Sequence, residues 1–179
     1  MVRTFAVSGT ASGLGLAVRA RLEAAGHRVI GVDLRDAEVT ADLSTPEGRV
    51  AAIAGVTTAS GGSIDGVASV AGVGPHLPSE LVVSVNHFGA MAFLDGLLPS
   101  LSGRTGAAAV AVSSNSITLD PTVRADLVDA CLADDEAAAR SIAAEVPGNT
   151  AYASSKLAVA RAVRRRVTAW GEAGVRLNA

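Results

Sequence analysis

Cysteine is almost absent from the 179-residue chain, which contains only Cys131. A single cysteine excludes an internal disulfide. Neither Cys131 nor the histidines His76 and His87 have Cys or His neighbours at the spacing of metal ligands. We therefore expect no structural disulfide and no metal site. Cys131 is predicted to be a small residue of the hydrophobic core.

Aromatic residues and net charge are also scarce. Phe, Trp and Tyr make up 3% of the chain and the formal net charge is -2, which gives no electrostatic or stacking basis for binding nucleic acid. No uninterrupted apolar run reaches the ~18 residues of a membrane span. The first residues lack the apolar core and cleavage site of a secretory signal. These absences predict a soluble, cytoplasmic protein without nucleic-acid or membrane partners.

The length of the chain and the order of its elements predict one domain over residues 1–179. Short β-rich runs alternate with segments of helical periodicity, which is typical of a Rossmann-type, doubly wound parallel sheet in three α/β/α layers. A long helix is expected over residues 81–98. Strands are expected near residues 3–7, 27–32, 38–41, 64–70 and 107–112, and from residue 175 onward.

A glycine-rich turn, Ser8-Gly9-Thr10-Ala11-Ser12-Gly13-Leu14-Gly15, joins the first expected strand to the first expected helix. Strand, glycine-rich turn and helix in this order indicate a dinucleotide site, with the pyrophosphate at the helix N-terminus. We expect Gly9 to permit the tight turn, Gly13 to let the backbone approach the pyrophosphate, and Gly15 to allow close packing of helix on strand. An ordinary glycine-rich β-to-α turn is the alternative. The residues expected to contact the cofactor here are Gly9, Ser12, Gly13, Leu14 and Gly15.

Asp33 ends the second expected strand, twenty residues after Gly13. A carboxylate at this point accepts hydrogen bonds from the adenosine ribose and repels a 2′-phosphate, which favours NAD over NADP. Arg35 weakens the inference because guanidinium groups bind phosphates. We expect NAD as the cofactor, with NADP the less favoured alternative.

Residues that follow the next two strands also belong to the expected cofactor site, because ligands bind at the carboxyl ends of parallel strands. Asp42 and Leu43 follow the third strand and are expected beside the adenine, although Asp42 equally suits the start of the turn before Pro46. Ala71 and Gly72 follow the fourth strand, where small side chains leave room for a ribose.

Two further positions have open alternatives. Ser113 and Ser114 end the fifth strand and can point at a substrate, or they are simply serines at a strand exit. Asn86 lies within the long expected helix. A buried asparagine can hold a water molecule in a proton chain, or its amide can satisfy backbone groups at a helix irregularity.

Tyr152 and Lys156 are four residues apart in a segment with apolar residues at helical spacing. Positions i and i+4 share a helix face, so an ammonium group lies beside a phenol. A neighbouring positive charge stabilises the phenolate, the form that acts as a base. Taken alone, such a pair also arises on an ordinary amphipathic surface helix.

The stretch before the tyrosine, about residues 117–148, is rich in alanine and charge, and one or two helices are expected within it. It separates the serines from Tyr152 and is predicted to form a small subdomain or an interface. A cluster of basic side chains follows on the Tyr152 helix and is interpreted as a solvated face. Its members are Arg161, Arg164, Arg165 and Arg166.

In sequence order, the chain contains Gly9-x-x-x-Gly13-x-Gly15, Ala71-Gly72, Asn86, Ser114 and Tyr152-x-x-x-Lys156. With this set it resembles the short-chain dehydrogenase/reductase family, and the glycine spacing matches the short type. Residues 27–56, 82–86 and 169–178 are similar to a bacterial hydroxysteroid dehydrogenase/carbonyl reductase subfamily. That subfamily has an extra helical segment before the tyrosine.

The resemblance implies an oxidoreductase that moves a hydride between NAD(H) and a secondary alcohol or ketone, such as a 3α-hydroxysteroid or a xenobiotic carbonyl. It implies that Tyr152 is the general acid/base, and that Lys156 favours the phenolate and holds the nicotinamide ribose. Ser114, rather than Ser113, would hydrogen-bond the substrate oxygen, and Asn86 would support a water relay. A homodimer or homotetramer is implied as well.

Two departures from the family pattern stand out. The glycine-rich turn begins with Ser8 where many relatives have threonine. Family members also continue beyond the position of Ala179 with a substrate lid and a last strand, which are not expected in this chain. The second departure motivates a different hypothesis, a catalytically silent NAD(P)-binding module that acts through partners.

Overall fold

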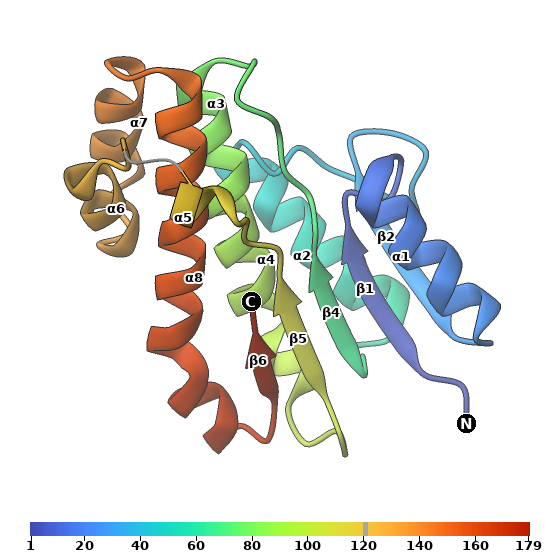
Figure 1. The fold of residues 1–179 in the computed structure, drawn as a ribbon. Helices are drawn as coiled ribbons and strands as arrows, with labels where there is room; N and C mark the ends of the chain where they lie inside the picture. The colour runs from blue at the N-terminus through green and yellow to red at the C-terminus, as the bar shows by residue number, and fades with distance from the viewer. Residues whose placement is uncertain (120–121) are drawn as a thin grey trace.

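A computed structural model describes residues 1–119 and 122–179 of the chain (Figure 1). Within these residues, six parallel strands form one sheet in the order β3-β2-β1-β4-β5-β6. This is the predicted doubly wound parallel sheet, so the expected fold class is confirmed. The strands are β1 (Thr4–Ser8), β2 (Arg28–Asp33), β3 (Val39–Thr40), β4 (Gly66–Ser69), β5 (Ala108–Ala111) and β6 (Arg176–Asn178).

The central strands are apolar on both faces because helices cover both sides of this part of the sheet. In β1 and β2, Val7, Ile30 and Val32 are each at most 1% exposed. The strand order reverses between β1 and β4, since β2 lies on one side of β1 and β4 on the other. Such a reversal opens a crevice at the carboxyl ends of the two strands, where ligands bind in open α/β sheets.

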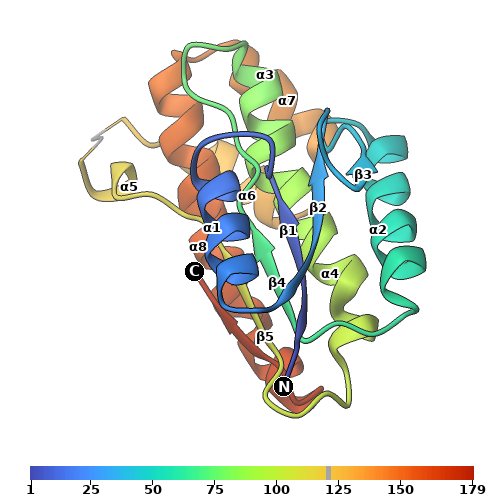
Figure 2. The same cartoon turned by 90° about the vertical axis from the view of Figure 1, so that its right-hand side faces the viewer.

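The helices form one layer on each face of the sheet. On one face, α1 (Gly13–Ala24) packs against β1 and β2. On the other face, α2 (Pro46–Ser60), α4 (Ala90–Leu101) and α8 (Gly148–Glu172) pack side by side. Figure 2 shows α1 on one side of the sheet and α2 and α4 on the other. The main core, between this second layer and the sheet, contains Phe93, Leu94 and Trp170.

The long helix expected over residues 81–98 consists of α3 (Ser79–Val83), a π-helical turn η1 (Ser84–Gly89) and α4. Its length and average composition meet those of a membrane span, although polar residues interrupt its apolar runs. However, 67% of its apolar window is buried inside the protein, as in the core helix of a globular fold. A helix irregularity at Asn86 was one of two alternatives, but its π-helical form was not predicted. Such turns occur frequently at functional sites.

The stretch expected to form a helical insertion, about residues 117–148, holds α6 (Ala125–Leu132) and α7 (Glu136–Ala144) and most of a short helix α5 (Ser116–Leu119). Residues 120 and 121 of this stretch lie outside the described residues. Below, the pair α6 and α7 is called the insertion. These helices pack on each other, on α3 and on the first half of α8, and form the outer layer at the left of Figure 1.

The insertion has its own apolar cluster. It joins Leu127, Val128 and Cys131 of α6 to Val83 and Phe88 of the long helix. The Cys131 side chain is buried there, and burial raises the pKa of its thiol to about 12. The prediction of a small core residue is confirmed.

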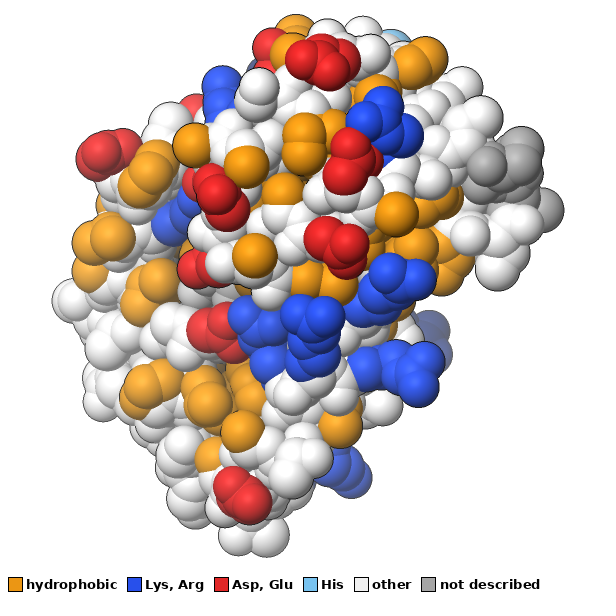
Figure 3. All heavy atoms as spheres, turned by 90° about the vertical axis from the view of Figure 1, so that its left-hand side faces the viewer, with side chains coloured by type: hydrophobic (Ala, Val, Ile, Leu, Met, Phe, Trp, Pro, Cys, Tyr) orange, Lys and Arg blue, Asp and Glu red, His pale blue; other side chains and the backbone are white. Residues whose placement is uncertain are grey.

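The basic cluster of α8 lies on the surface, as expected. Arg161, Arg164 and Arg165 are exposed, while Arg166 is half-buried and pairs with Asp95 of α4 at 2.8 Å. Figure 3 views the side of the molecule that carries α6, α7 and α8, and shows basic side chains gathered near the middle of this face with acidic ones around them.

Candidate active site

A cleft of about 320 Å³ opens at the carboxyl ends of β1, β2 and β4. Every residue predicted to contact the cofactor lines it, except Tyr152 and Lys156. These lining residues are Gly9, Ser12, Gly13, Leu14, Gly15, Asp33, Asp42, Leu43, Ala71 and Gly72. Sequence reasoning missed the apolar lining, although its members are close neighbours of the predicted residues. They are Val32, Leu34, Ala41, Val70, Val73 and Val85.

The glycine-rich turn has the geometry expected of a phosphate-binding turn. Gly9 has a φ of +80°, and a Cβ there would lie 2.9 Å from Ala71 Cα, so only glycine fits. A Cβ on Gly15 would overlap the Gly9 carbonyl group. At Gly13 a Cβ would meet nothing within 4 Å, so the turn is open to the cleft. The Ser12 side chain does not cap α1, which leaves the first N–H groups of the helix to an anion.

Asp33 is held in place at the end of β2. Its Oδ2 accepts a hydrogen bond from Ala11 N at 2.9 Å, and its Oδ1 accepts one from Leu34 N at 2.7 Å. The Arg35 side chain is 80% exposed, and its nearest ionic partner is Asp36 at 3.8 Å. The cleft wall therefore presents the carboxylate of Asp33 and not the guanidinium of Arg35.

Asp42 begins the turn, as one of its two alternatives predicts, while its contact with the adenine stays a prediction. It lines the cleft, and its Oδ1 accepts a hydrogen bond from Ser44 N at 2.8 Å, which begins the turn before α2. Helix α2 then starts at Pro46, where Thr45 Oγ1 caps it by accepting from Gly48 N at 3.0 Å.

Ser8 is a residue that sequence reasoning did not include in the site. It is completely buried, and its Oγ accepts hydrogen bonds from Val70 N at 3.0 Å and Ala71 N at 3.1 Å. The hydroxyl thus fixes the loop after β4 to the end of β1. The sequence signal that could have revealed Ser8 is its position directly before Gly9, where many relatives have another hydroxyl residue.

Lys156 lies deep in the structure beside the cleft. It is 4% exposed, its Nζ donates to Val112 O at 2.9 Å, and the same Nζ is 5.9 Å from the centre of the Tyr152 ring. Burial lowers the pKa of Lys156 to about 8. A Cβ on Gly72 would lie 3.5 Å from this Nζ, so the ammonium group is near both the end of the cleft and the Tyr152 ring. Tyr152 and Lys156 are the only tyrosine and the only lysine of the chain.

Asn86 lies in the π-helical turn η1 and is completely buried. Its Nδ2 donates to Val73 O at 3.0 Å, and its Oδ1 accepts from Val73 N at 2.8 Å. The amide therefore satisfies backbone groups at a helix irregularity, which is the second of the two alternatives. It also lies against Gly72, where a Cβ would be 3.1 Å from Oδ1. A role in a water relay stays a prediction.

The two serines after β5 have different partners. Ser113 Oγ donates to Lys156 O at 2.9 Å, so this hydroxyl fastens the strand end to α8. Ser114 Oγ accepts from Ser116 N at 3.2 Å. Because a hydroxyl can accept and donate at once, that bond leaves the Ser114 O–H to a substrate oxygen. Ser114 therefore remains the better candidate for substrate binding.

Within residues 1–119 and 122–179, no group of three or more His, Cys, Asp or Glu side chains is placed to hold a metal ion. The ammonium group of Lys156 near the ring of Tyr152, beside the cleft, is an arrangement that an acid/base role would require.

Comparison with known proteins agrees with this geometry. No family model matches the chain. The chain is 49% identical over 176 residues to the 3-alpha-hydroxysteroid dehydrogenase/carbonyl reductase of Comamonas testosteroni. The aligned region covers 96% of this chain and 68% of that protein.

Two solved structures share the fold. One is the 3-alpha-hydroxysteroid dehydrogenase from Pseudomonas sp. B-0831 complexed with NADH, which has 46% sequence identity, a TM-score of 0.94, and coverage of 98% of this chain and 70% of that one. The other is a short-chain dehydrogenase/reductase from Brucella ovis, with 25% identity and a TM-score of 0.73. That match covers 97% of this chain and 79% of the Brucella chain. The chain belongs to the short-chain dehydrogenase/reductase family.

Proposed function

We propose that this protein is an NAD(H)-dependent oxidoreductase that interconverts a secondary alcohol and a ketone. The observation that carries the proposal is the position of Lys156. Its buried ammonium group lies between Gly72 at the end of the cleft and the ring of Tyr152. A charged side chain that is 4% exposed beside a dinucleotide cleft is expensive to maintain, which favours a role in binding and catalysis over a structural one.

The cleft fits NAD better than NADP. The open turn at Gly13 and the uncapped start of α1 suit a pyrophosphate, and the Asp33 carboxylate suits the two hydroxyls of an adenosine ribose. The similar Pseudomonas enzyme is complexed with NADH, which supports the same cofactor here.

Each polar group of the candidate site has a distinct role in the proposed reaction. Bound NAD supplies the nicotinamide carbon that accepts the hydride from the carbinol carbon. Tyr152 takes the alcohol proton during oxidation and returns it to the ketone oxygen during reduction. Lys156 stabilises the phenolate by its charge and holds the nicotinamide ribose. Ser114 donates its O–H to the substrate oxygen and so orients it.

The substrate class is proposed from the relatives. The names of the Comamonas and Pseudomonas proteins refer to 3-alpha-hydroxysteroids, and that of the first also to carbonyl compounds. We extend both substrate classes to this chain. We also propose a homodimer or homotetramer that works in the cytoplasm, where NAD is used and where the single buried thiol of Cys131 would stay reduced.

The reaction can be tested by following the absorbance of NADH while the protein is mixed with NAD and a 3α-hydroxysteroid. Tyr152→Phe removes only the phenolic oxygen and is expected to lower kcat/KM about 1000-fold, because positioned acid/base groups contribute about 100- to 10,000-fold. NADH binding should persist in this variant.

Thr168→Ala is the matched control, since it removes a hydroxyl from an exposed position of the same helix. Undiminished turnover in Tyr152→Phe would contradict the proposed mechanism. NADH binding without turnover of any secondary alcohol would favour the second hypothesis, a catalytically silent module that acts through partners.

A further inference from the structure

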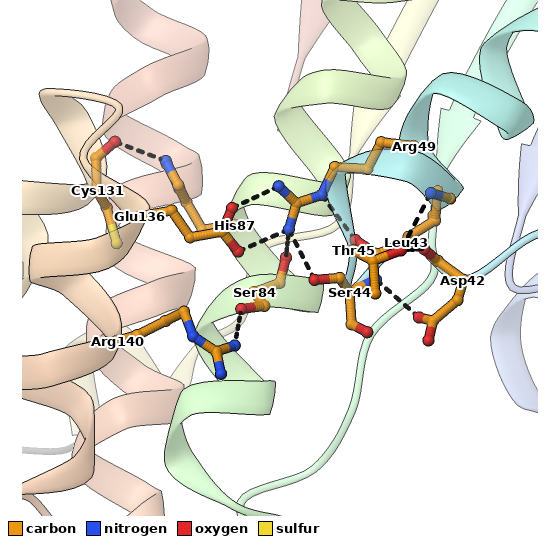
Figure 4. A network of polar contacts seen from close by, with 11 residues as sticks. Asp42, Leu43, Ser44, Thr45, Arg49, Ser84, His87, Cys131, Glu136 and Arg140 are labelled. Carbon is orange, nitrogen blue, oxygen red and sulfur yellow. Dashed lines mark hydrogen bonds and ion pairs between the residues drawn. The ribbon is translucent and has the colours of Figure 1, made fainter.

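The most buried arginine of the chain lies outside the proposed catalytic group. Arg49 of α2 is 8% exposed, and its guanidinium donates to both carboxylate oxygens of Glu136 at 2.6 and 2.7 Å. Glu136 is the first residue of α7 and is separated from Arg49 by 87 positions. Figure 4 shows the two side chains reaching toward each other from α2 and α7. The pair therefore ties α2 to the insertion.

Arg49 also donates hydrogen bonds to the main chain behind the cleft. Its Nε donates to Leu43 O at 2.8 Å, and its Nη2 donates to Ser44 O at 3.1 Å and to Ser84 O at 3.2 Å. Leu43 is a cleft residue that follows β3, the strand next to β2 and its Asp33. The arginine therefore holds the cleft wall at the end where the adenosine is expected.

Besides the hydrogen bond from Arg49, Ser84 accepts a second hydrogen bond from a residue of the insertion. Arg140 of α7 donates to Ser84 Oγ at 2.7 Å (Figure 4), and Ser84 is completely buried. Ser84 begins the π-helical turn η1. The last residue of that turn, Gly89, lies so close to the wall that a Cβ there would be 2.8 Å from Leu43 O. The Leu43 main chain is thus enclosed between η1 and the guanidinium of Arg49.

We propose that Arg49 and Glu136 are positioning residues that fix the Leu43 wall of the cleft, so that the insertion sets the affinity for the adenosine end of NAD(H). The proposal rests on the proposed function. An ion pair between a buried arginine and a half-buried glutamate contributes little stability relative to apolar packing, whereas a bidentate pair with three further carbonyl contacts defines a geometry. The pair is accordingly assigned to the shape of the cofactor site and not to the stability of the fold.

The test compares the wild-type chain with Arg49→Lys, which keeps the charge but loses the bidentate fork, and with the isosteric Glu136→Gln. Arg104→Lys is the matched control. Arg104 also contacts a buried carboxylate, Asp65 Oδ1, at 2.6 and 3.1 Å, but at the amino end of β4, opposite the cleft. Dissociation constants are measured for NADH by nicotinamide fluorescence and for AMP by competition, with circular dichroism to verify folding.

We expect Arg49→Lys and Glu136→Gln to raise the dissociation constants of NADH and AMP together, by about five- to tenfold. The fluorescence of bound NADH at saturation should equal that of the wild type, because the nicotinamide end is unchanged. In turnover, KM for NAD should rise while kcat stays constant. Arg104→Lys should stay within about twofold of the wild type for both ligands.

Unchanged affinities for NADH and AMP in the folded variants would overturn the inference while leaving the proposed function intact. Equal weakening in Arg104→Lys would also overturn it, since the effect would then be one of general stability. Failure of the wild-type chain to bind NADH would overturn the inference and the proposed function together.

Discussion

Burial of Lys156 lowers the stability of the fold but places the ammonium group where the proposed activity needs it. The ammonium group is needed beside the phenol, but burial disfavours its charge and lowers its pKa from 10.5 to about 8. Between these two pH values the unfolded chain holds a proton that the folded chain has lost, so stability rises with pH across this window. At neutral pH the protein is therefore less stable than it would be with an uncharged side chain here.

We predict that Lys156→Met stabilises the protein at pH 7 and abolishes turnover. The pKa difference corresponds to about 3 kcal/mol of desolvation, and the lost hydrogen bond to Val112 O offsets about 1 kcal/mol of it, so the expected gain is about 2 kcal/mol. Urea unfolding at pH 7 and at pH 10 measures the effect, which should shrink at the higher pH. An equal or reduced stability of Lys156→Met at pH 7 would contradict this account.

The residues of the site differ in how readily sequence reveals them. Gly9, Gly13 and Asp33 are recognisable because local backbone geometry at a strand end determines them. The function of Ser8 depends on a loop about 62 positions away, and that of Arg49 on a carboxylate 87 positions away. Contacts at such separations form only in the folded chain, which is why no pattern in the sequence indicated the role of Arg49, and only the position of Ser8 before Gly9 pointed to that of Ser8.

At the scale of elements, η1 and α6 are joined by a buried histidine. His87 of η1 is 2% exposed, and its Nε2 lies 2.9 Å from Cys131 O at the end of α6. Burial lowers the pKa of His87 to about 4, so its ring is neutral at physiological pH. Protonation would place a charge between the long helix and the insertion, where burial and the charges of Arg49 and Arg166 oppose it and Glu136 only partly offsets them.

Acid should therefore weaken this junction. The unfolded chain binds a proton at His87 near pH 6.5 and the folded chain only near pH 4, so the stability present above pH 6.5 falls as the pH drops toward 4, by about 3 kcal/mol in total. We predict a flatter pH dependence of unfolding for His87→Gln than for the wild type. The matched control is His76→Gln, at an exposed position. Parallel curves for His87→Gln and the wild type would refute the assignment.

The order and type of the main elements could be predicted from sequence, but not their irregularities. The strands are short apolar runs between turn residues, and the start of α2 is marked by Thr45 and Pro46. The π-helical turn η1 gave no such signal, because it accompanies the close approach of Gly89 to the Leu43 main chain. Helix α5, with four residues, is too short to show a periodicity.

At the scale of the whole molecule, α8 connects two apolar cores. Its first half contributes Ala151 and Ala158 to the cluster of the insertion, and its second half contributes Val163 and Trp170 to the main core. A helix shared in this way favours cooperative unfolding of sheet and insertion, because neither cluster can lose α8 without exposing the other.

We predict that Trp170 fluorescence and Cys131 thiol accessibility report the same unfolding midpoint. Trp170 is buried in the main core and Cys131 in the insertion cluster, and each is the only residue of its type. NADH at a hundredfold excess over its dissociation constant should raise the stability seen by both probes by about 2.7 kcal/mol. An earlier transition of the thiol signal, unaffected by NADH, would instead reveal an independent insertion.

The presence of one tyrosine and one lysine, a single helical turn apart, allows the proposed acid/base pair to be observed without any substitution or chemical probe. Ultraviolet titration of phenolate absorbance reports Tyr152 alone, and nitrogen-15 lysine gives a single side-chain resonance from Lys156. The ionisation of both groups can thus be followed in the unmodified protein, with and without NADH. The coupling between them becomes a measurable quantity, since each titration can be repeated with the other residue substituted.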